Sequence, residues 1–180
     1  MKVLGVSGSL RADSYNTRLL EAAAAAAPAG VDVELFDPAL VAALPLYDQD
    51  LDLEGDVPVS VQRLRADWAE ADALLFATPE YNGSVPGGLK NAVDWASRPR
   101  LEAALVNKTA AVIGASTGQF GALWAQQDLK KILGIAGARV VGEGLPVARA
   151  QDGFGEAVHD HLRNVLQLLV EAGSLDEIAA

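Results

Sequence analysis

Short apolar runs alternate with amphipathic helical patterns along this chain, and this alternation limits the possible folds more than any other feature of the sequence. Apolar runs typical of β-strands occur at residues 3–6, 31–36, 73–77, 109–113 and 139–141. Helical spacing occurs between and after them, at residues 15–27, 61–71, 86–96, 129–136 and 158–172. Strands that alternate with helices form right-handed crossovers and a parallel sheet. We therefore expect an α/β fold with a single, doubly wound, five-stranded parallel sheet.

The strand sequences also indicate the order of the strands. The first, third and fourth runs are apolar throughout, as expected for central strands that are covered on both faces. The second run alternates, with Val31, Val33 and Leu35 on one side and acidic residues on the other, which is typical of an edge strand. This pattern fits the flavodoxin-like order 2-1-3-4-5. No repeat or low-complexity linker divides the chain, so we expect residues 1–180 to form one domain.

Composition and charge exclude several classes of protein. Hydrophobic residues make up 51% of the 180 residues and charged residues 21%, which excludes disorder. The sequence contains no run of 18 apolar residues, so it predicts no membrane span. The chain has no cysteine, so thiolate chemistry is excluded. A formal net charge of −10 argues against nucleic-acid binding. The first ten residues show no signal peptide, so we expect a cytoplasmic protein.

The charges are unevenly distributed along the chain. Residues 1–20 contain three basic residues and one acidic residue, a local balance of 3 − 1 = +2. Residues 37–56 contain six acidic residues and no basic residue. We therefore expect an anionic ligand to be attracted to the first segment and repelled by the second.

Three loops follow the first, third and fourth predicted strands, at residues 7–16, 78–85 and 114–121. Ligands of open α/β sheets bind beyond the carboxyl ends of the strands, near the point where the strand order reverses. The expected strand order places these three loops together at that point. They are also rich in glycine, hydroxyl and amide residues, although glycine-rich loops alone are common in α/β proteins.

The first loop has the composition of a phosphate site. It joins a predicted buried strand to a helix N-terminus, whose amides favour anions. Ser9, Ser14, Asn16 and Thr17 add hydrogen-bonding side chains, and Arg11 adds a positive charge. The loop is neither a Walker A motif nor a dinucleotide fingerprint. The alternative is that Ser14 only caps the helix and Arg11 is solvated.

The second loop has the composition of a site for a planar ring. Pro79, Asn82 and Gly83 favour turns that direct backbone amides outward, and Tyr81 offers a flat face. A planar heteroaromatic ligand needs donors and acceptors along one edge and stacking on one face. The alternative is an ordinary loop with a packed tyrosine.

Two motifs together carry a resemblance to a known family. The motifs are Gly8-Ser9-Leu10-Arg11 with Ser14 and Asn16, and the run from Pro79-Glu80-Tyr81-Asn82-Gly83 to Asp94-Trp95. They resemble the NADPH-dependent FMN reductases, a family of flavodoxin-like quinone, azo-dye and chromate reductases, and the resemblance extends over nearly the whole chain. It implies an FMN-dependent enzyme that passes hydride from NADPH or NADH, through flavin N5, to a quinone-like or other small electron acceptor.

The resemblance also implies a role for individual residues. The residues implied to hold the FMN phosphate are Ser9, Arg11, Ser14, Asn16 and Thr17. Those implied to line the isoalloxazine are Pro79, Glu80, Tyr81, Asn82 and Gly83, with Ser116 and Gly118 flanking the ring from the third loop. No catalytic side chain and no metal are required, because the flavin supplies the chemistry. The resemblance further implies a homodimer or homotetramer, in which residues 44–50 reach toward the neighbouring subunit's flavin.

Two other functions compete with this interpretation. A flavodoxin-type electron carrier would bind FMN without oxidising NADPH. A serine hydrolase is suggested by Gly114-Ala115-Ser116-Thr117-Gly118, which matches G-x-S-x-G between a strand and a helix, with Asp152 and His159 or His161 later in the chain. Both histidines fall within the last predicted helix rather than in a loop, which argues against that catalytic arrangement.

The acidic segment 48–56 raises the question of a metal site. It has no glycine at the position that a calcium-binding loop requires, and it lacks the closing pattern of a calcium-binding hand. A solvated acidic loop or a contact between subunits is the favoured interpretation.

Overall fold

The computed structural model describes residues 1–52 and 57–179. Its strands are β1 (Lys2–Ser7), β2 (Asp32–Leu35), β3 (Ala73–Ala77), β4 (Thr109–Ala115), β5 (Arg139–Val140) and β6 (Pro146–Val147). Its α-helices are α1 (Tyr15–Ala25), α2 (Pro38–Ala42), α3 (Val59–Glu70), α4 (Gly87–Ala96), α5 (Leu123–Ile135) and α6 (Glu156–Ala179). Two short 3-10 helices, η1 (Gln49–Leu51) and η2 (Ala150–Asp152), lie in loops.

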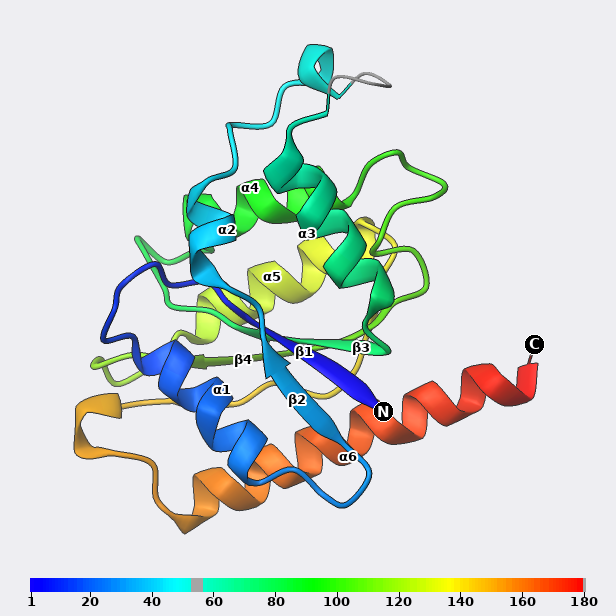
Figure 1. The fold of residues 1–180 in the computed structure, drawn as a ribbon. Helices are drawn as coiled ribbons and strands as arrows, with labels where there is room; N and C mark the ends of the chain where they lie inside the picture. The colour runs from blue at the N-terminus through cyan, green and yellow to red at the C-terminus, as the bar shows by residue number, and fades with distance from the viewer. Residues whose placement is uncertain (53–56, 180) are drawn as a thin grey trace.

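The strands form one parallel sheet in the order β2-β1-β3-β4-β5, which confirms the predicted fold class and strand order (Figure 1). β1 pairs with β2 and with β3, and β3 pairs with β4, all in parallel register. The order reverses between β1 and β3, so the loops after β1, β3 and β4 meet at the same edge of the sheet. These loops lie together at the left of Figure 1, away from the N-terminus.

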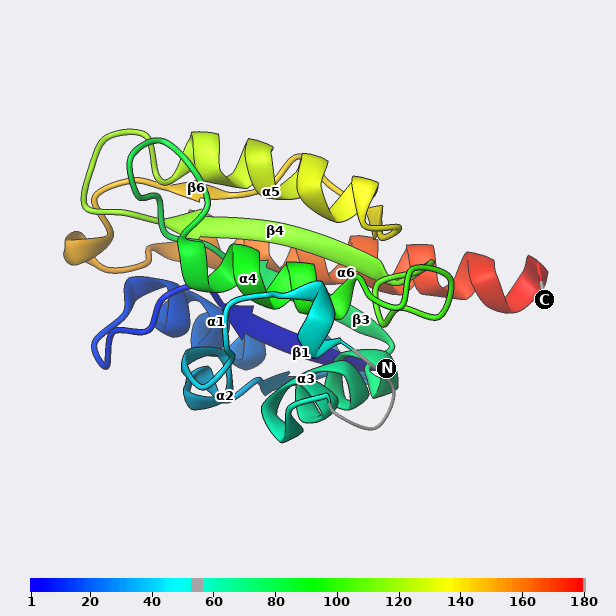
Figure 2. The same ribbon diagram turned by 90° about the horizontal axis from the view of Figure 1, so that it is seen from above.

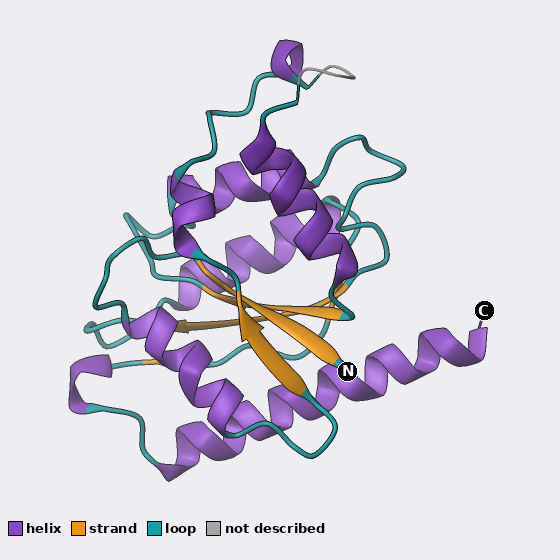
Figure 3. Ribbon diagram, viewed as in Figure 1, coloured by secondary structure: helices purple, strands orange, loops and turns teal. Residues whose placement is uncertain are grey.

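Helices cover both faces of the sheet, as Figures 2 and 3 show. Alternate residues of β1, β3 and β4 enter two separate cores. On one face Leu4, Phe76 and Val112 pack with residues of α3, α4 and α5. On the other face Val3 and Ile113 pack with residues of α1 and α6. The layers therefore fix the central strands, and with them the start of each loop at the carboxyl edge.

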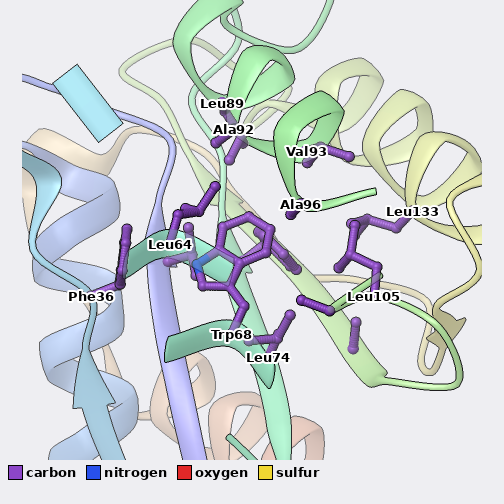
Figure 4. Close-up of a cluster of buried hydrophobic side chains, with 14 of the residues drawn as sticks. Phe36, Leu64, Trp68, Leu74, Leu89, Ala92, Val93, Ala96, Leu105 and Leu133 are labelled. Carbon is purple, nitrogen blue, oxygen red and sulfur yellow. The ribbon is translucent and has the colours of Figure 1, made fainter. Parts of the chain in front are cut away.

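Figure 4 shows the core beneath α3 and α4, which is centred on Trp68. The Trp68 side chain is fully buried and contacts Phe36 and Phe76 edge to face, at centroid distances of 6.2 and 5.3 Å. Its indole nitrogen has no hydrogen-bond partner among the residues that the structure describes. Trp95 is also fully buried, whereas Trp124 is partly exposed.

Two details of the predicted fold are wrong. The fifth strand position is divided, because β5 pairs with the start of β4 and the sixth strand, β6, pairs with its end. Gly142 and Gly144 adopt positive φ angles of 75° and 94° between them, which interrupts the strand. Leu35 was expected to face inward but is exposed, while the next residue, Phe36, is buried on the opposite face.

The acidic segment is only partly described. η1 begins after Asp48, whose carboxylate accepts a hydrogen bond from the Asp50 amide at 2.9 Å. Asp52 forms a salt bridge with Arg65 at 2.8 Å. Glu54 and Asp56 lie outside the described residues. Within residues 1–52 and 57–179, no group of three or more His, Asp or Glu side chains is arranged as a metal site. Nor does any helix in those ranges have the length and hydropathy needed to cross a membrane.

Candidate functional site

The first loop connects β1 to α1 and is held by its own hydroxyl groups. Ser14 caps α1, because its Oγ accepts hydrogen bonds from the amides of Asn16 and Thr17 at 3.2 and 3.3 Å. The Ser7 and Thr17 hydroxyls lie 3.0 Å apart, and Ser9 Oγ accepts from the Arg11 amide at 3.4 Å. The hydroxyl hydrogens of Ser9 and Ser14 have no acceptor within the described residues. They remain available to a ligand.

Arg11 supplies the positive charge of this loop. Its side chain is exposed, and the guanidinium has no hydrogen-bond or ion-pair partner in the described part of the chain. Arg18, one helical turn into α1, differs because it pairs with Asp13 at 3.4 Å. An unpaired guanidinium beside a helix N-terminus favours a bound anion, and a phosphate ester accepts charge-assisted hydrogen bonds from both.

The second loop contains a tight hairpin turn. The backbones of Tyr81 and Ser84 exchange two hydrogen bonds, of 3.1 and 3.2 Å. Asn82 and Gly83 between them have positive φ angles of 53° and 75°, as a type I′ turn requires. The amides of these two residues donate to no group among the described residues. The turn thus presents free backbone donors beside the ring of Tyr81, which is 50% exposed.

The second loop is anchored to α5 at two points. The Glu80 carboxylate accepts hydrogen bonds from the amides of Trp124 and Ala125, at 2.9 and 3.1 Å. It therefore caps α5, whose own N-cap residue, Ala122, has no side chain able to do so. Ser84 Oγ donates to the Asp128 carboxylate at 2.7 Å. These contacts fix the hairpin turn relative to the start of α5.

The third loop follows β4 and is held by backbone contacts with residues 145–150. The Ser116 amide donates to Val147 O, and the Ala150 amide donates to Ser116 O, both at 3.0 Å. Gly121 adopts a φ of 57°, and a Cβ atom there would lie 2.5 Å from the carbonyl carbon of Pro146. Only glycine allows this approach of two backbones. β6, which follows the predicted fifth strand, therefore packs against the third loop and supports it.

The three loops enclose one polar cavity of about 160 Å³ at the carboxyl edge of the sheet. Eight of the predicted site residues line it: Ser9, Arg11, Ser14, Asn16, Pro79, Glu80, Tyr81 and Ser116. Four do not, namely Thr17, Asn82, Gly83 and Gly118, although each lies next to or within one turn of a residue that does. Three lining residues were missed in the sequence: Tyr15, Ala115 and Thr117.

A larger hollow of about 790 Å³ lies elsewhere, between Tyr47, Arg65 and residues 98–102. Residues 98–102 follow the C-terminal end of α4, on the side of the molecule away from the three loops. The Arg65 guanidinium is already paired with Asp52 and donates to Trp95 O at 2.9 Å. Size alone does not make this hollow the site, because the smaller cavity lies at the carboxyl edge of the sheet, where ligands of open α/β folds bind.

The donor set of the smaller cavity fits FMN. An unpaired guanidinium, two uncommitted hydroxyl groups and a helix N-terminus stand at one end, where a phosphate would lie. The half-exposed Tyr81 also lines the cavity and offers a flat face to a ring, and the free amides of Asn82 and Gly83 follow it in the chain, outside the lining itself.

Comparison with known proteins agrees with this fit. Residues 1–152 match the family model described as NADPH-dependent FMN reductase. The chain belongs to the NADPH-dependent FMN reductase family. This FMN reductase is 42% identical over 176 residues to an NAD(P)H-dependent FMN reductase of Pseudomonas aeruginosa, covering 96% of this chain and 92% of that protein. The predicted family, the FMN cofactor and the NAD(P)H-dependent oxidoreductase activity are confirmed.

Two further relatives are similar in sequence or in structure. A 2-hydroxy-1,4-benzoquinone reductase of Burkholderia is 43% identical over 132 residues, covering 73% of this chain and 69% of that protein. A flavoenzyme NAD(P)H:(acceptor) oxidoreductase of Paracoccus denitrificans superposes with a TM-score of 0.81 at 32% identity, covering 95% of this chain and 98% of that one.

The competing hydrolase interpretation is not supported by the geometry of this FMN reductase. Both imidazoles lie on α6, where His159 Nδ1 is 3.0 Å from Gly155 O and His161 Nε2 is 3.1 Å from Gly144 O. Neither contacts the Ser116 hydroxyl. A nucleophilic serine needs an adjacent base, and Ser116 has none among the described residues, although it lines the cavity formed by the three loops.

Proposed function

We propose that this FMN reductase uses NAD(P)H to reduce a small quinone-like acceptor, with FMN held by the three loops at the carboxyl edge of the sheet. The observation that carries the proposal is the unpaired Arg11 guanidinium beside the α1 N-terminus, within the cavity that the three loops share. The acceptor class is supported by the relatives named as quinone reductases.

At the phosphate end we propose that the side chains of Ser9, Arg11, Ser14 and Thr17 bind the FMN phosphate. Arg11 supplies a charge-assisted hydrogen bond, worth about 1.5–3 kcal/mol. The hydroxyls of Ser9 and Ser14 each have a free hydrogen to donate. Since the chain carries a net charge of −10, local positive charge is needed to retain a dianionic group.

At the ring end we propose that Pro79, Tyr81, Asn82 and Gly83 line one edge, and that Ser116 and Gly118 flank the other. These residues would hold the ring, and bound FMN would supply the hydride-transfer chemistry between the nicotinamide and the acceptor. The free amides of Asn82 and Gly83 are suited to stabilise negative charge on the pyrimidine edge of the ring. We propose that a nicotinamide and then an acceptor approach the ring beside Tyr81, whose side chain is half exposed.

We further propose a cytoplasmic homodimer or homotetramer in which residues 1–180 act as one domain. The segment implied to reach a neighbouring subunit is fixed against α4, because Asn91 Nδ2 and Trp95 Nε1 both donate to Pro45 O at 2.8 Å. The Tyr47 amide donates to Asn91 Oδ1 at 2.8 Å, and Leu46, which lies between Pro45 and Tyr47, is 82% exposed. A rigid segment with an exposed leucine is suited to a subunit contact.

Two measurements test the proposed function. The purified full chain should show the absorbance spectrum of bound flavin, and it should consume NADPH or NADH in steady state when a benzoquinone is supplied. A flavodoxin-type carrier would bind FMN but would not oxidise the nicotinamide directly. A chain that binds no FMN when the cofactor is in excess would refute the proposal.

A further inference from the structure

The side-chain amide of Asn16 is buried and bonded on both of its polar atoms. Asn16 Nδ2 donates to Ala115 O at 3.0 Å, and Asn16 Oδ1 accepts from the Ala115 amide at 2.9 Å. Only 3% of the residue is exposed. The amide thus pairs with the backbone of Ala115 as a neighbouring strand would, across 99 positions of sequence.

This pair joins two of the loops that form the flavin cavity. Asn16 lies in the first turn of α1, and its own amide donates to Ser14 Oγ. Ala115 ends β4 and immediately precedes Ser116 and Thr117, which line the cavity and which we propose lie beside the ring. A shift of Ala115 would therefore move both of these residues relative to the phosphate end.

The same contacts leave the Asn16 side chain with little capacity for a phosphate. An amide group has two N–H donors and one carbonyl acceptor, and the Ala115 pair occupies one donor and the acceptor. Turning the amide toward a ligand would leave the buried Ala115 amide and carbonyl unsatisfied, which is costly. Arg11, by contrast, has its whole guanidinium free within the described residues.

From this we infer that Asn16 is a positioning residue, which locks the first loop to the third and sets the shape of the ring side, rather than a ligand of the phosphate. The inference rests on the proposed function and changes the role that the family resemblance implies for this residue. It predicts that loss of the Asn16 side-chain amide lowers the affinity for a flavin with a phosphate and for one without a phosphate by the same factor.

Comparing FMN with riboflavin, which has the same ring but no phosphate, tests this inference. We would titrate both flavins into the full chain carrying Asn16→Ala, and into Arg11→Ala as the matched variant at the phosphate end. Asn16→Ala should lower the affinity for both flavins by a similar factor of about ten. Arg11→Ala should weaken FMN strongly and leave riboflavin nearly unchanged. Circular dichroism and a thermal melt would establish that each variant folds.

Should Asn16→Ala fail to fold, Asn16→Asp provides a second variant. It retains an acceptor for the Ala115 amide but loses the donor to Ala115 O. A positioning role predicts weaker riboflavin binding in this variant too, although no phosphate is present to be repelled by the new charge.

The outcomes separate the inference from the proposed function. Loss of FMN affinity with unchanged riboflavin affinity would make Asn16 a phosphate ligand and overturn the inference. A lower melting temperature with unchanged affinity for both flavins would also overturn it, since Asn16 would then support only overall stability. Failure of the unmodified chain to bind either flavin would instead refute the proposed function.

Discussion

Two lysines near the amino end of the sheet and one arginine at its carboxyl end differ in how they are bonded. At the amino end, Lys2 Nζ lies 3.3 and 3.2 Å from the carboxylates of Glu34 and Glu70. Lys108 Nζ donates to the carbonyls of Ala69 and Ala71 at the end of α3. At the carboxyl end, the Arg11 guanidinium and the amides of the second-loop turn have no partner among the described residues.

The difference lies in whether these polar groups find their bonding partners within the chain or remain available to a ligand. The same strands, β1, β3 and β4, supply both ends, so the contrast comes from the loops and not from the sheet. At the amino end, Lys2 and Lys108 form bonds within the chain. Groups left free at the carboxyl end are available to bind a cofactor. Substitutions at the two ends should therefore affect different measurements.

The largest effect is expected from Arg11→Ala. Losing one charge-assisted hydrogen bond of about 1.5–3 kcal/mol should weaken FMN binding by about ten- to a hundredfold, with little change in the melting temperature of the flavin-free chain. Fluorescence titration with FMN measures this. Arg18→Ala is the matched control, because Arg18 is already paired with Asp13 and should change the affinity by less than about threefold. Full FMN retention by Arg11→Ala would contradict the contrast between the two ends.

The reverse pattern is expected from Lys108→Met at the amino end. Removing the donor to the Ala69 and Ala71 carbonyls should lower the free energy of unfolding by about 2 kcal/mol and leave FMN affinity unchanged. Urea denaturation of the flavin-free chain measures the first quantity. Lys131→Met, at an exposed lysine that only approaches Asp128 at 3.8 Å, should change stability by less than about 0.5 kcal/mol. A loss of FMN affinity in Lys108→Met would show that the two ends are coupled.

Glu80 sharpens the comparison, because it is a charged group at the carboxyl end whose bonds are internal. Glu80→Ala removes the cap of α5 and should lower the free energy of unfolding by about 1 kcal/mol. Glu80→Gln keeps an acceptor for the Trp124 and Ala125 amides and should lose less. If Glu80→Ala instead weakened FMN binding at unchanged stability, Glu80 would belong with the ligand-binding groups.

The smallest expected effect is a dependence of stability on alkaline pH. Burial lowers the pKa of Lys108 below its ordinary value of 10.5, although Asp72 opposes this. Between the lowered pKa and 10.5 the unfolded chain binds more protons than the folded chain, so this group makes stability rise with pH. Lys2 acts oppositely: hydrogen bonds to Glu70 and Glu34 raise its pKa, and the stability they give is lost as pH rises through that raised value. In denaturation at several pH values, the free energy of unfolding of the unmodified chain minus that of Lys108→Met should increase as pH rises toward 10.5; a constant difference would count against the Lys108 assignment.

Much of the fold was predictable because it depends on local patterns. The fully apolar runs identified the central strands, and Pro86 directly precedes α4. The division of the fifth strand was missed, since β6 has only two residues and pairs with a strand that ends about thirty positions earlier. Helix α2 was missed because its five residues fall in an irregular, acidic and proline-rich stretch.

The site was predictable as a group of loops but less so as individual side chains. Glycine, hydroxyl and amide residues after three strands were sufficient to locate the cavity. The internal hydrogen bonds of Asn16 and Glu80 could not be predicted, because their partners lie 99 and 44 to 45 residues away in the sequence. Nothing in the local sequence distinguishes an amide that meets a ligand from one that meets a distant backbone.

Gly121 has a consequence for how such a cleft can diversify. A side chain there would collide with the backbone of Pro146 and Val147, so any replacement would have to displace the third loop from β6. The neighbouring Phe120 is half exposed and meets no such barrier. Replacement of the side chain is therefore tolerated more readily at Phe120 than at Gly121, one position further along the chain.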